Sequence, residues 1–149
     1  MKITAMRTFM TVDGSRPRAL IKVETDEGIH GWGEAYCHGP ELAIEPLVDY
    51  IFEMIKGEDP RRIEFLMLKL FQQFRFPPGA LGLAAISGVD HALWDISGKA
   101  ADLPVYMLLG GKAVKARDGL GWLVDYAGPM DDALAKAWAI ASAPFLLAA

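Results

Sequence analysis

The feature that most constrains this chain is a change in hydrophobic periodicity after its first third. Up to residue 36, short segments rich in β-formers alternate apolar with polar side chains or are broken by turn residues. Residues 41–101 instead repeat apolar side chains every three or four positions. Two-residue alternation is typical of a half-buried strand, and a 3.6-residue repeat is typical of an amphipathic helix. The pattern therefore predicts an α+β fold in which strands come first and helices follow.

The first part of this fold is predicted to be a three-stranded antiparallel meander. Its strands are expected over residues 2–10, 19–25 and 29–36. The segment 13–18 (DGSRPR) is predicted to be a loop because it holds Gly14 and Pro17. A hairpin is predicted at residues 26–28 (DEG), with Gly28 at positive φ.

The second part is predicted to be a helical bundle. Helices are expected over residues 41–56, 60–74 and 80–101. Gly57 is expected to end the first helix, and Asp59 to cap the second with Pro60 at its first position.

Small residues predict a close approach between two of these elements. Ala84, Gly88 and Ala92 form a stripe along the third helix, which lets another helix or a sheet come near. Gly31 and Gly33 flank Trp32 in the third strand and indicate that its backbone also approaches a neighbour closely.

Composition narrows the class of protein. The hydrophobic content of 52% excludes a mainly disordered chain, and 15 basic against 19 acidic residues give a net charge of −4, which argues against a nucleic-acid partner. The single cysteine, Cys37, excludes an internal disulfide and a zinc site made of cysteines. No signal peptide or apolar run of about 18 residues is recognised, so the expectation is a cytoplasmic protein with no membrane partner.

Three segments carry a resemblance to a known family. They are VETDEGIHGWGEAY (23–36), GEDPRRIE (57–64) and AAISGVDHALWDISGKAADLPVYMLLGGK (84–112). The order of these pieces resembles the N-terminal capping domain of the enolase superfamily, in the mandelate racemase/muconate lactonizing enzyme branch. Within that branch the chain looks most like acid-sugar dehydratases of the galactonate and mannonate type.

The resemblance implies two domains. Residues 1–112 correspond to the capping domain, and residues 113–149 resemble the first strand and helix of a (β/α)8 barrel. A complete barrel needs about 250 residues, so the 149 residues here are expected to hold only the start of a truncated one. The apolar side chains of that second part are expected to favour self-association.

The resemblance also implies a chemistry. Family members abstract a proton next to a carboxylate and stabilise the enediolate with Mg²⁺ held by three carboxylates. The family's base and metal ligands lie on later barrel strands, and no position of this chain matches them. No catalytic or metal-binding residue is therefore assigned, and the chain alone is expected to be inactive, with an acid sugar as substrate only where the barrel is supplied.

The substrate contacts implied for this chain are in lid loops, expected at 13–18 and 36–41. Arg16 could pair with a substrate carboxylate, while Tyr36 and His38 could donate hydrogen bonds to sugar hydroxyls. Arg75, which precedes two prolines, is a further candidate. A solvated loop side chain is the alternative for each.

Other ionisable residues are interpreted as structural. Asp95 and Lys99 are four residues apart and can pair on one helix face, whereas Asp90 and His91 are adjacent and do not face each other. Glu34 is interpreted as an interface residue that holds the barrel.

Two functional alternatives stay open at this point. One is a non-enzymatic, stand-alone binding or oligomerisation module, and the other is an unrelated α+β binding protein.

Overall fold

The computed structural model describes residues 1–13, 16–35, 39–74 and 77–111. The chain divides into two compact units, Met1–Asp102 and Leu103–Ala149. The first unit contains strands β1 (Ile3–Asp13), β2 (Arg16–Thr25) and β3 (His30–Ala35), a short 3-10 turn η1 (Glu41–Ala43), and helices α1 (Ile44–Ile55), α2 (Ile63–Gln73) and α3 (Gly79–Ala101). The described part of the second unit, residues 103–111, carries the short helix α4 (Val105–Leu108).

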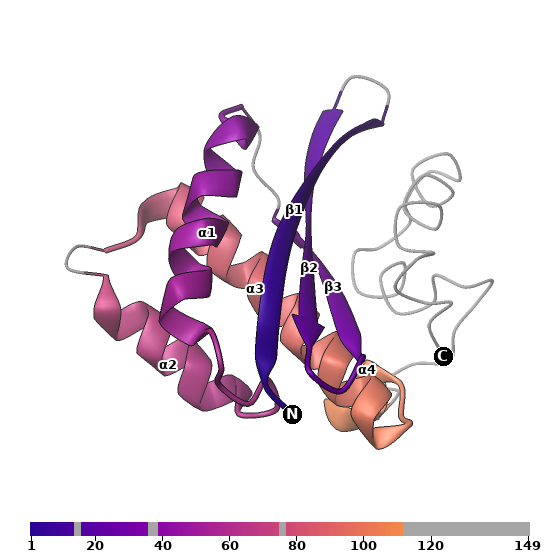
Figure 1. The fold of residues 1–149 in the computed structure, drawn as a ribbon. Helices are drawn as coiled ribbons and strands as arrows, with labels where there is room; N and C mark the ends of the chain where they lie inside the picture. The colour runs from indigo at the N-terminus through magenta and orange to yellow at the C-terminus, as the bar shows by residue number, and fades with distance from the viewer. Residues whose placement is uncertain (14–15, 36–38, 75–76, 112–149) are drawn as a thin grey trace. The chain divides into compact units, whose positions relative to one another are not determined.

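The three strands form an antiparallel sheet in the order β1-β2-β3, which confirms the predicted meander (Figure 1). The turn between β2 and β3 has Gly28 at φ +81°, as its position in DEG predicts. Thr25 closes this turn, because its hydroxyl donates to the Ile29 carbonyl at 2.7 Å.

The predicted loop at 13–18 is wrong in its extent. β1 runs to Asp13 and β2 begins at Arg16, with Val12 opposite Pro17. Proline lacks an N–H and is tolerated in a strand only where no neighbouring strand needs that donor. β3 pairs with β2 only over Ala19–Glu24, so Pro17 removes no bond from that ladder.

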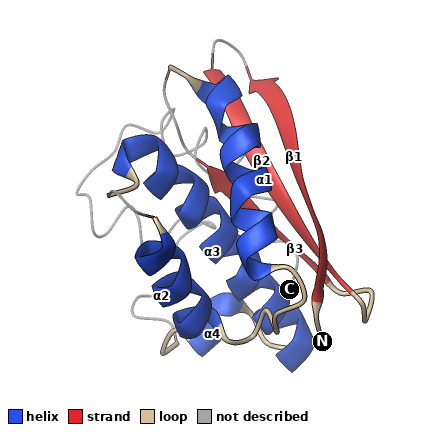
Figure 2. Ribbon diagram, turned by 60° about the vertical axis from the view of Figure 1, so that its left-hand side comes forward, coloured by secondary structure: helices blue, strands red, loops and turns tan. Residues whose placement is uncertain are grey.

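Helices α1 and α3 cover one face of the sheet, and α2 packs against these two helices (Figure 2). The strands turn alternate side chains toward them, and β3 alternates half-buried and buried residues along its whole length. The core holds fully buried aliphatic side chains from both layers: Ile21, Val23, Ile44, Val48, Ile51, Ile55, Leu66, Leu70, Val89, Leu93 and Ile96. This burial confirms the helical stripes that the sequence predicts.

The start of α2 differs from the prediction. Asp59 does not cap the helix; its carboxylate accepts the Arg61 backbone N–H at 3.0 Å and the Arg61 side chain at 2.7 Å. Arg62 N–H then bonds to the Asp59 carbonyl, so a turn precedes the helix. The aspartate satisfies a donor two residues ahead, and α2 begins only at Ile63.

α3 packs directly on the backbone of β3. A Cβ at Gly31 would meet the carbonyl oxygen of Ala92, and a Cβ at Gly33 would meet that of Gly88. A Cβ at Gly88 would lie 2.9 Å from the Ala35 nitrogen. The close approach predicted from the small residues is therefore confirmed, and it joins the third strand to the third helix.

Candidate functional site

The candidate site is the end of the sheet where β1 ends, β2 begins and β3 ends (Figure 1). The turn from β1 to β2 and the connection from β3 to η1 both leave the sheet there, because the antiparallel order places Ala35 opposite Ala19, near the start of β2. At the far side of the second connection, Gly39 N–H donates to Glu41 Oε1 at 2.7 Å, which holds the chain as it enters η1. Two connections at one sheet end are a suitable frame for a lid.

Of the four predicted substrate contacts, only Arg16 lies within the described residues. Arg16 is the first residue of β2 and pairs with Asp13 in register, but its side chain is not among those described. Tyr36, His38 and Arg75 lie outside the described residues. The backbone nevertheless places Arg16 and Ala35, the residue before Tyr36, at the same end of the sheet.

A second set of polar and aromatic side chains, which was not predicted as a group, lies on the sheet face opposite the helices. The rings of Phe9 and Trp32 are 5.4 Å apart and tilted by 46°, and Lys22 Nζ lies 5.9 Å from the Trp32 ring. Arg18 Nη1 reaches both carboxylate oxygens of Glu34 at 3.4 Å. The signal was available, because all five residues alternate with the inward positions of their strands.

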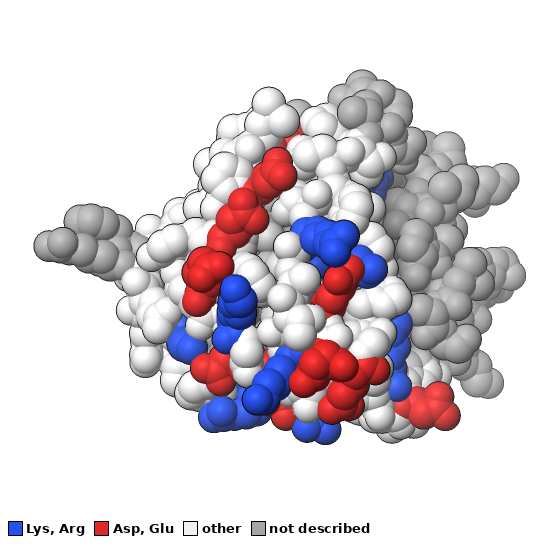
Figure 3. All heavy atoms as spheres, in the orientation of Figure 1, with Lys and Arg blue, Asp and Glu red and all other residues white. Residues whose placement is uncertain are grey.

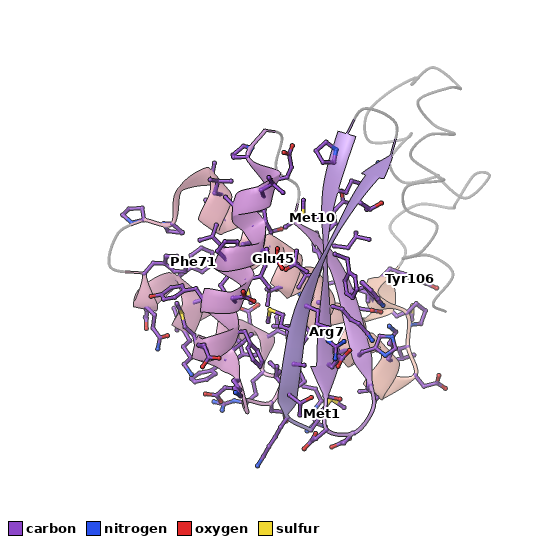
Figure 4. The ribbon with its side chains drawn as sticks, turned by 45° about the horizontal axis from the view of Figure 1, so that its top comes forward. Met1, Arg7, Met10, Glu45, Phe71 and Tyr106 are labelled. Carbon is purple, nitrogen blue, oxygen red and sulfur yellow. The ribbon has the colours of Figure 1, made fainter. Side chains whose placement is uncertain are left out.

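The same face carries a second charge pair further from the site. Arg7 lies 3.7 Å from Glu24, and Lys22 lies 2.9 Å from the same carboxylate. The hydrogen bond from Lys22 is the main cause that lowers the pKa of Glu24. Figure 4 shows Arg7 on the strands and Phe71 on the helical side of this unit. The face is therefore amphipathic, with aromatic rings among ion pairs.

The interpretation of Asp95 and Lys99 as a structural pair is confirmed. Their side chains meet at 2.7 Å, and both also bond to the backbone of β3. Asp90 is half buried, and burial raises the pKa of its carboxyl, with Glu64 adding to the increase and His91 opposing it. His91 is exposed, and the structure gives no hydrogen bond between it and Asp90 among the described contacts, in keeping with neighbours that point apart.

Exposed carboxylates follow one line on α1, from Glu45 through Asp49 to Glu53 (Figure 3). Like charges four residues apart repel and slightly weaken a helix. This row makes the surface over α1 acidic. A phosphate backbone would be repelled from such a surface.

The metal-binding capacity of the described segments is limited. Among residues 1–13, 16–35, 39–74 and 77–111, no three His, Cys, Asp or Glu side chains gather closely enough to hold an ion. The described carboxylates therefore do not fit the Mg²⁺ site that the resemblance implies, and no step on this chain is derived through a metal. Within the same segments, no helix combines the length and apolar character needed to cross a bilayer.

Comparison with known sequences gives a consistent set of relatives. The model of the mandelate racemase/muconate lactonizing enzyme N-terminal domain matches residues 2–110. D-galactonate dehydratase of Variovorax paradoxus is 40% identical over 124 residues, which cover 83% of this chain and 31% of that protein. D-galactonate dehydratase of Xanthomonas axonopodis pv. citri is 46% identical over 112 residues, or 74% of this chain and 28% of the relative. The chain thus spans less than a third of these relatives.

Solved structures agree with this placement. An enolase from Agrobacterium radiobacter, bound to sodium and L-malate, matches with a TM-score of 0.74 and 56% identity over 76% of this chain and 29% of its own. An enolase from Pantoea ananatis, with D-gluconate and magnesium bound, matches with a TM-score of 0.72 and 38% identity over 75% of this chain and 28% of its own. The strand–helix order, the close packing of β3 on α3 and the match over residues 2–110 lead to one conclusion: the chain belongs to the mandelate racemase/muconate lactonizing enzyme family of the enolase superfamily, of which it carries the N-terminal domain.

Proposed function

We propose that this chain forms the substrate-covering part of an acid-sugar dehydratase that abstracts a proton next to a carboxylate. The observation that carries the proposal is the shared end of the sheet, at which β1 ends, β2 begins and β3 ends. The identity of 40% and 46% to D-galactonate dehydratases over this part of the chain supports a sugar acid as the substrate class.

In this proposal the chain binds and covers the substrate while a barrel supplies the chemistry. Arg16 pairs with a carboxylate of the sugar acid, and Tyr36 and His38 donate hydrogen bonds to its hydroxyls. Arg75 is a further contact to the same ligand. Covering the reacting centre excludes water and strengthens the electrostatic interactions inside the site.

The reaction itself is assigned to barrel residues that no position of this chain matches. Magnesium, held by barrel carboxylates in intact members, would stabilise the enediolate. The described segments offer no group of three ligands for such an ion. We therefore expect the chain alone to turn over no acid sugar. A stand-alone binding or oligomerisation module remains the second candidate, favoured by a cluster of buried core residues that, among the described residues, lies within residues 1–102.

The test is a chimera. Residues 1–112 replace the corresponding segment of the Xanthomonas axonopodis D-galactonate dehydratase, and dehydration of D-galactonate is measured with Mg²⁺. We expect turnover in the chimera and none in the chain or in the barrel alone. Arg16→Ala, Tyr36→Phe and His38→Ala should each raise KM, whereas Glu53→Gln, on the exposed face of α1, should leave it unchanged.

Two results would overturn the proposal. A folded chimera with no more turnover than the isolated barrel would remove the covering role. Turnover by the chain alone, in the presence of Mg²⁺, would show that the division between cover and chemistry is wrong.

A further inference from the structure

The free edge of β3 carries backbone groups that no strand of the sheet can pair. β3 is the last strand in the order β1-β2-β3, so every second residue directs its N–H and C=O away from β2. An open edge of this kind is a template on which a strand of another chain can be added.

Two side chains of α3 occupy this edge. Asp95 Oδ2 accepts the backbone N–H of Trp32 at 2.9 Å, and Lys99 Nζ donates to the carbonyl of His30 at 2.9 Å. The same Lys99 Nζ lies 2.7 Å from Asp95 Oδ2, so each side chain holds the other in place. Both side chains are mostly covered, with exposed fractions of 19% for Asp95 and 29% for Lys99.

The pattern of donors and acceptors is that of a neighbouring strand. In a β-ladder, the neighbour donates an N–H to the carbonyl before the facing residue and accepts the N–H of the residue after it. Here the facing residue is Gly31, Lys99 takes the place of the donor to His30, and Asp95 takes the place of the acceptor from Trp32.

The spacing of the two elements fits this substitution. Four residues along a helix advance about 6 Å, and two residues along a strand advance about 6.6 Å, so an i, i+4 pair on α3 can reach an i, i+2 pair on β3. Gly31 makes the approach possible, because a Cβ there would meet the Ala92 carbonyl oxygen and would lie 2.8 Å from Ile96 Cγ1.

We propose that Asp95 and Lys99 together act as a surrogate for a fourth strand and close the β3 edge against strand addition by a second copy of the chain. The ion pair is then an obstacle to β-sheet extension as well as a contact between helix and strand. It also holds β3 just before the segment that contains Tyr36 and His38. The proposal rests on the geometry of residues 1–102 and is independent of the substrate-covering role proposed above.

The experiment measures amide exchange at Trp32 and self-association in the full chain. In Asp95→Ala we expect the Trp32 amide to exchange at least about tenfold faster than in the wild type, because it loses a charged acceptor. At high protein concentration its protection should return as edges of two copies pair, and sedimentation should show an increase in dimer. Asp95→Asn keeps an acceptor oxygen and should stay close to the wild type in both readouts.

A matched ion pair serves as control. Lys69 and Glu58 are 2.8 Å apart with exposed fractions of 24% and 29%, and within the described residues neither side chain bonds to β3. Lys69→Ala should leave the Trp32 amide unchanged. If Asp95→Ala proves too unstable, Lys99→Met keeps the alkyl stem and should raise self-association relative to Lys69→Ala.

The proposal is overturned if the Trp32 amide exchanges at the same rate in Asp95→Ala and in the wild type, after both rates are corrected for the difference in global stability. It is equally overturned if Asp95→Asn exchanges as fast as Asp95→Ala, since charge rather than an acceptor would then matter. Concentration-independent exchange at Trp32 in Asp95→Ala would remove the claim that the edge is blocked against a second copy.

Discussion

The two outer strands of the sheet meet their helices in different ways. β1 packs on α1 through side chains such as Met6, Val48 and Ile51, whereas β3 packs on α3 backbone to backbone across Gly31 and Gly33. A contact between side chains can relax after substitution, but a contact between two backbones has no atoms that can move aside. The β3 side of the sheet should therefore be much less tolerant of substitution.

The edges of the two strands are also closed differently. At β1, Ile3 exchanges both backbone bonds with the chain that follows α1: Gly57 N–H donates to its carbonyl at 2.9 Å, and its own N–H donates to Glu58 O at 2.9 Å. At β3, side chains of α3 make the hydrogen bonds to the backbone at the edge of the sheet. Backbone closure depends on the shape of a turn, and side-chain closure depends on the identity of two residues.

The largest effect is expected at the backbone contact. Gly33→Val places side-chain atoms where the Gly88 carbonyl oxygen lies, so the fold should lose about 4 kcal/mol or more of unfolding free energy, beyond the usual cost of overpacking. Leu20→Val, on the β2 residue that pairs with Glu34, is the control and should cost little. Urea denaturation measures both, and a Gly33→Val protein as stable as Leu20→Val would refute the backbone contact.

A smaller loss is expected on the β1 side. Met6 is 8% exposed and contributes to the core, so Met6→Ala should cost about 2–4 kcal/mol in the free energy of unfolding. Phe9→Ala, on the other face of the same strand, should cost about 1 kcal/mol, mainly from its ring contact with Trp32. Equal losses in the two variants would mean that β1 does not have one buried face.

The backbone closure of β1 can be tested at Gly57, which has φ +80° and open space where a Cβ would lie. Gly57→Ala should cost about 1–2 kcal/mol, because an L-residue is strained in the left-handed region. Asn visits that region more readily, so Gly57→Asn should cost less. Thermal unfolding measures whether Gly57→Ala loses more stability than Gly57→Asn. A Gly57→Ala protein as stable as the wild type would show that the turn can change shape while Ile3 stays paired.

The smallest effect concerns pH. The hydrogen bond from the Arg61 side chain is the main cause that lowers the pKa of Asp59 to about 2, from 3.8. Because the folded-state pKa is depressed, the contribution to stability is present above the unfolded value and is lost as pH falls from about 4 toward 2. The pair is partly exposed, so the loss should be at most about 1 kcal/mol.

Urea titrations between pH 5 and pH 2 measure this loss. The stability difference between wild type and Asp59→Asn should shrink across that range. Asp49→Asn, which removes an exposed carboxylate on α1, is the control. A difference that stays constant with pH would show that Asp59 does not titrate with folding.

Local pattern predicted most of the elements. The positive φ of Gly28, the span of α3 and the pairing of Asp95 with Lys99 all follow from residues a few positions apart, and the structure confirms each. The errors at 13–18 and at Asp59 have separate causes. Pro17 predicts a loop, but whether a proline interrupts a ladder depends on how far the neighbouring strand extends. Asp59 predicts a cap, but its side chain accepts the Arg61 N–H in a turn that precedes the helix. The substrate roles of Arg16, Tyr36, His38 and Arg75 stay predictions.

What the sequence alone determined is which segments are strands and which are helices, and that Gly31, Gly33, Gly88 and their small neighbours approach something closely. The tertiary structure decided what they approach. A small residue shows that space is needed but not which partner uses it, so only the fold could pair Gly33 with Gly88. In the same way the i, i+4 spacing predicted an ion pair, but its second role at the β3 edge arises because α3 lies beside that strand, 63 residues away in the chain.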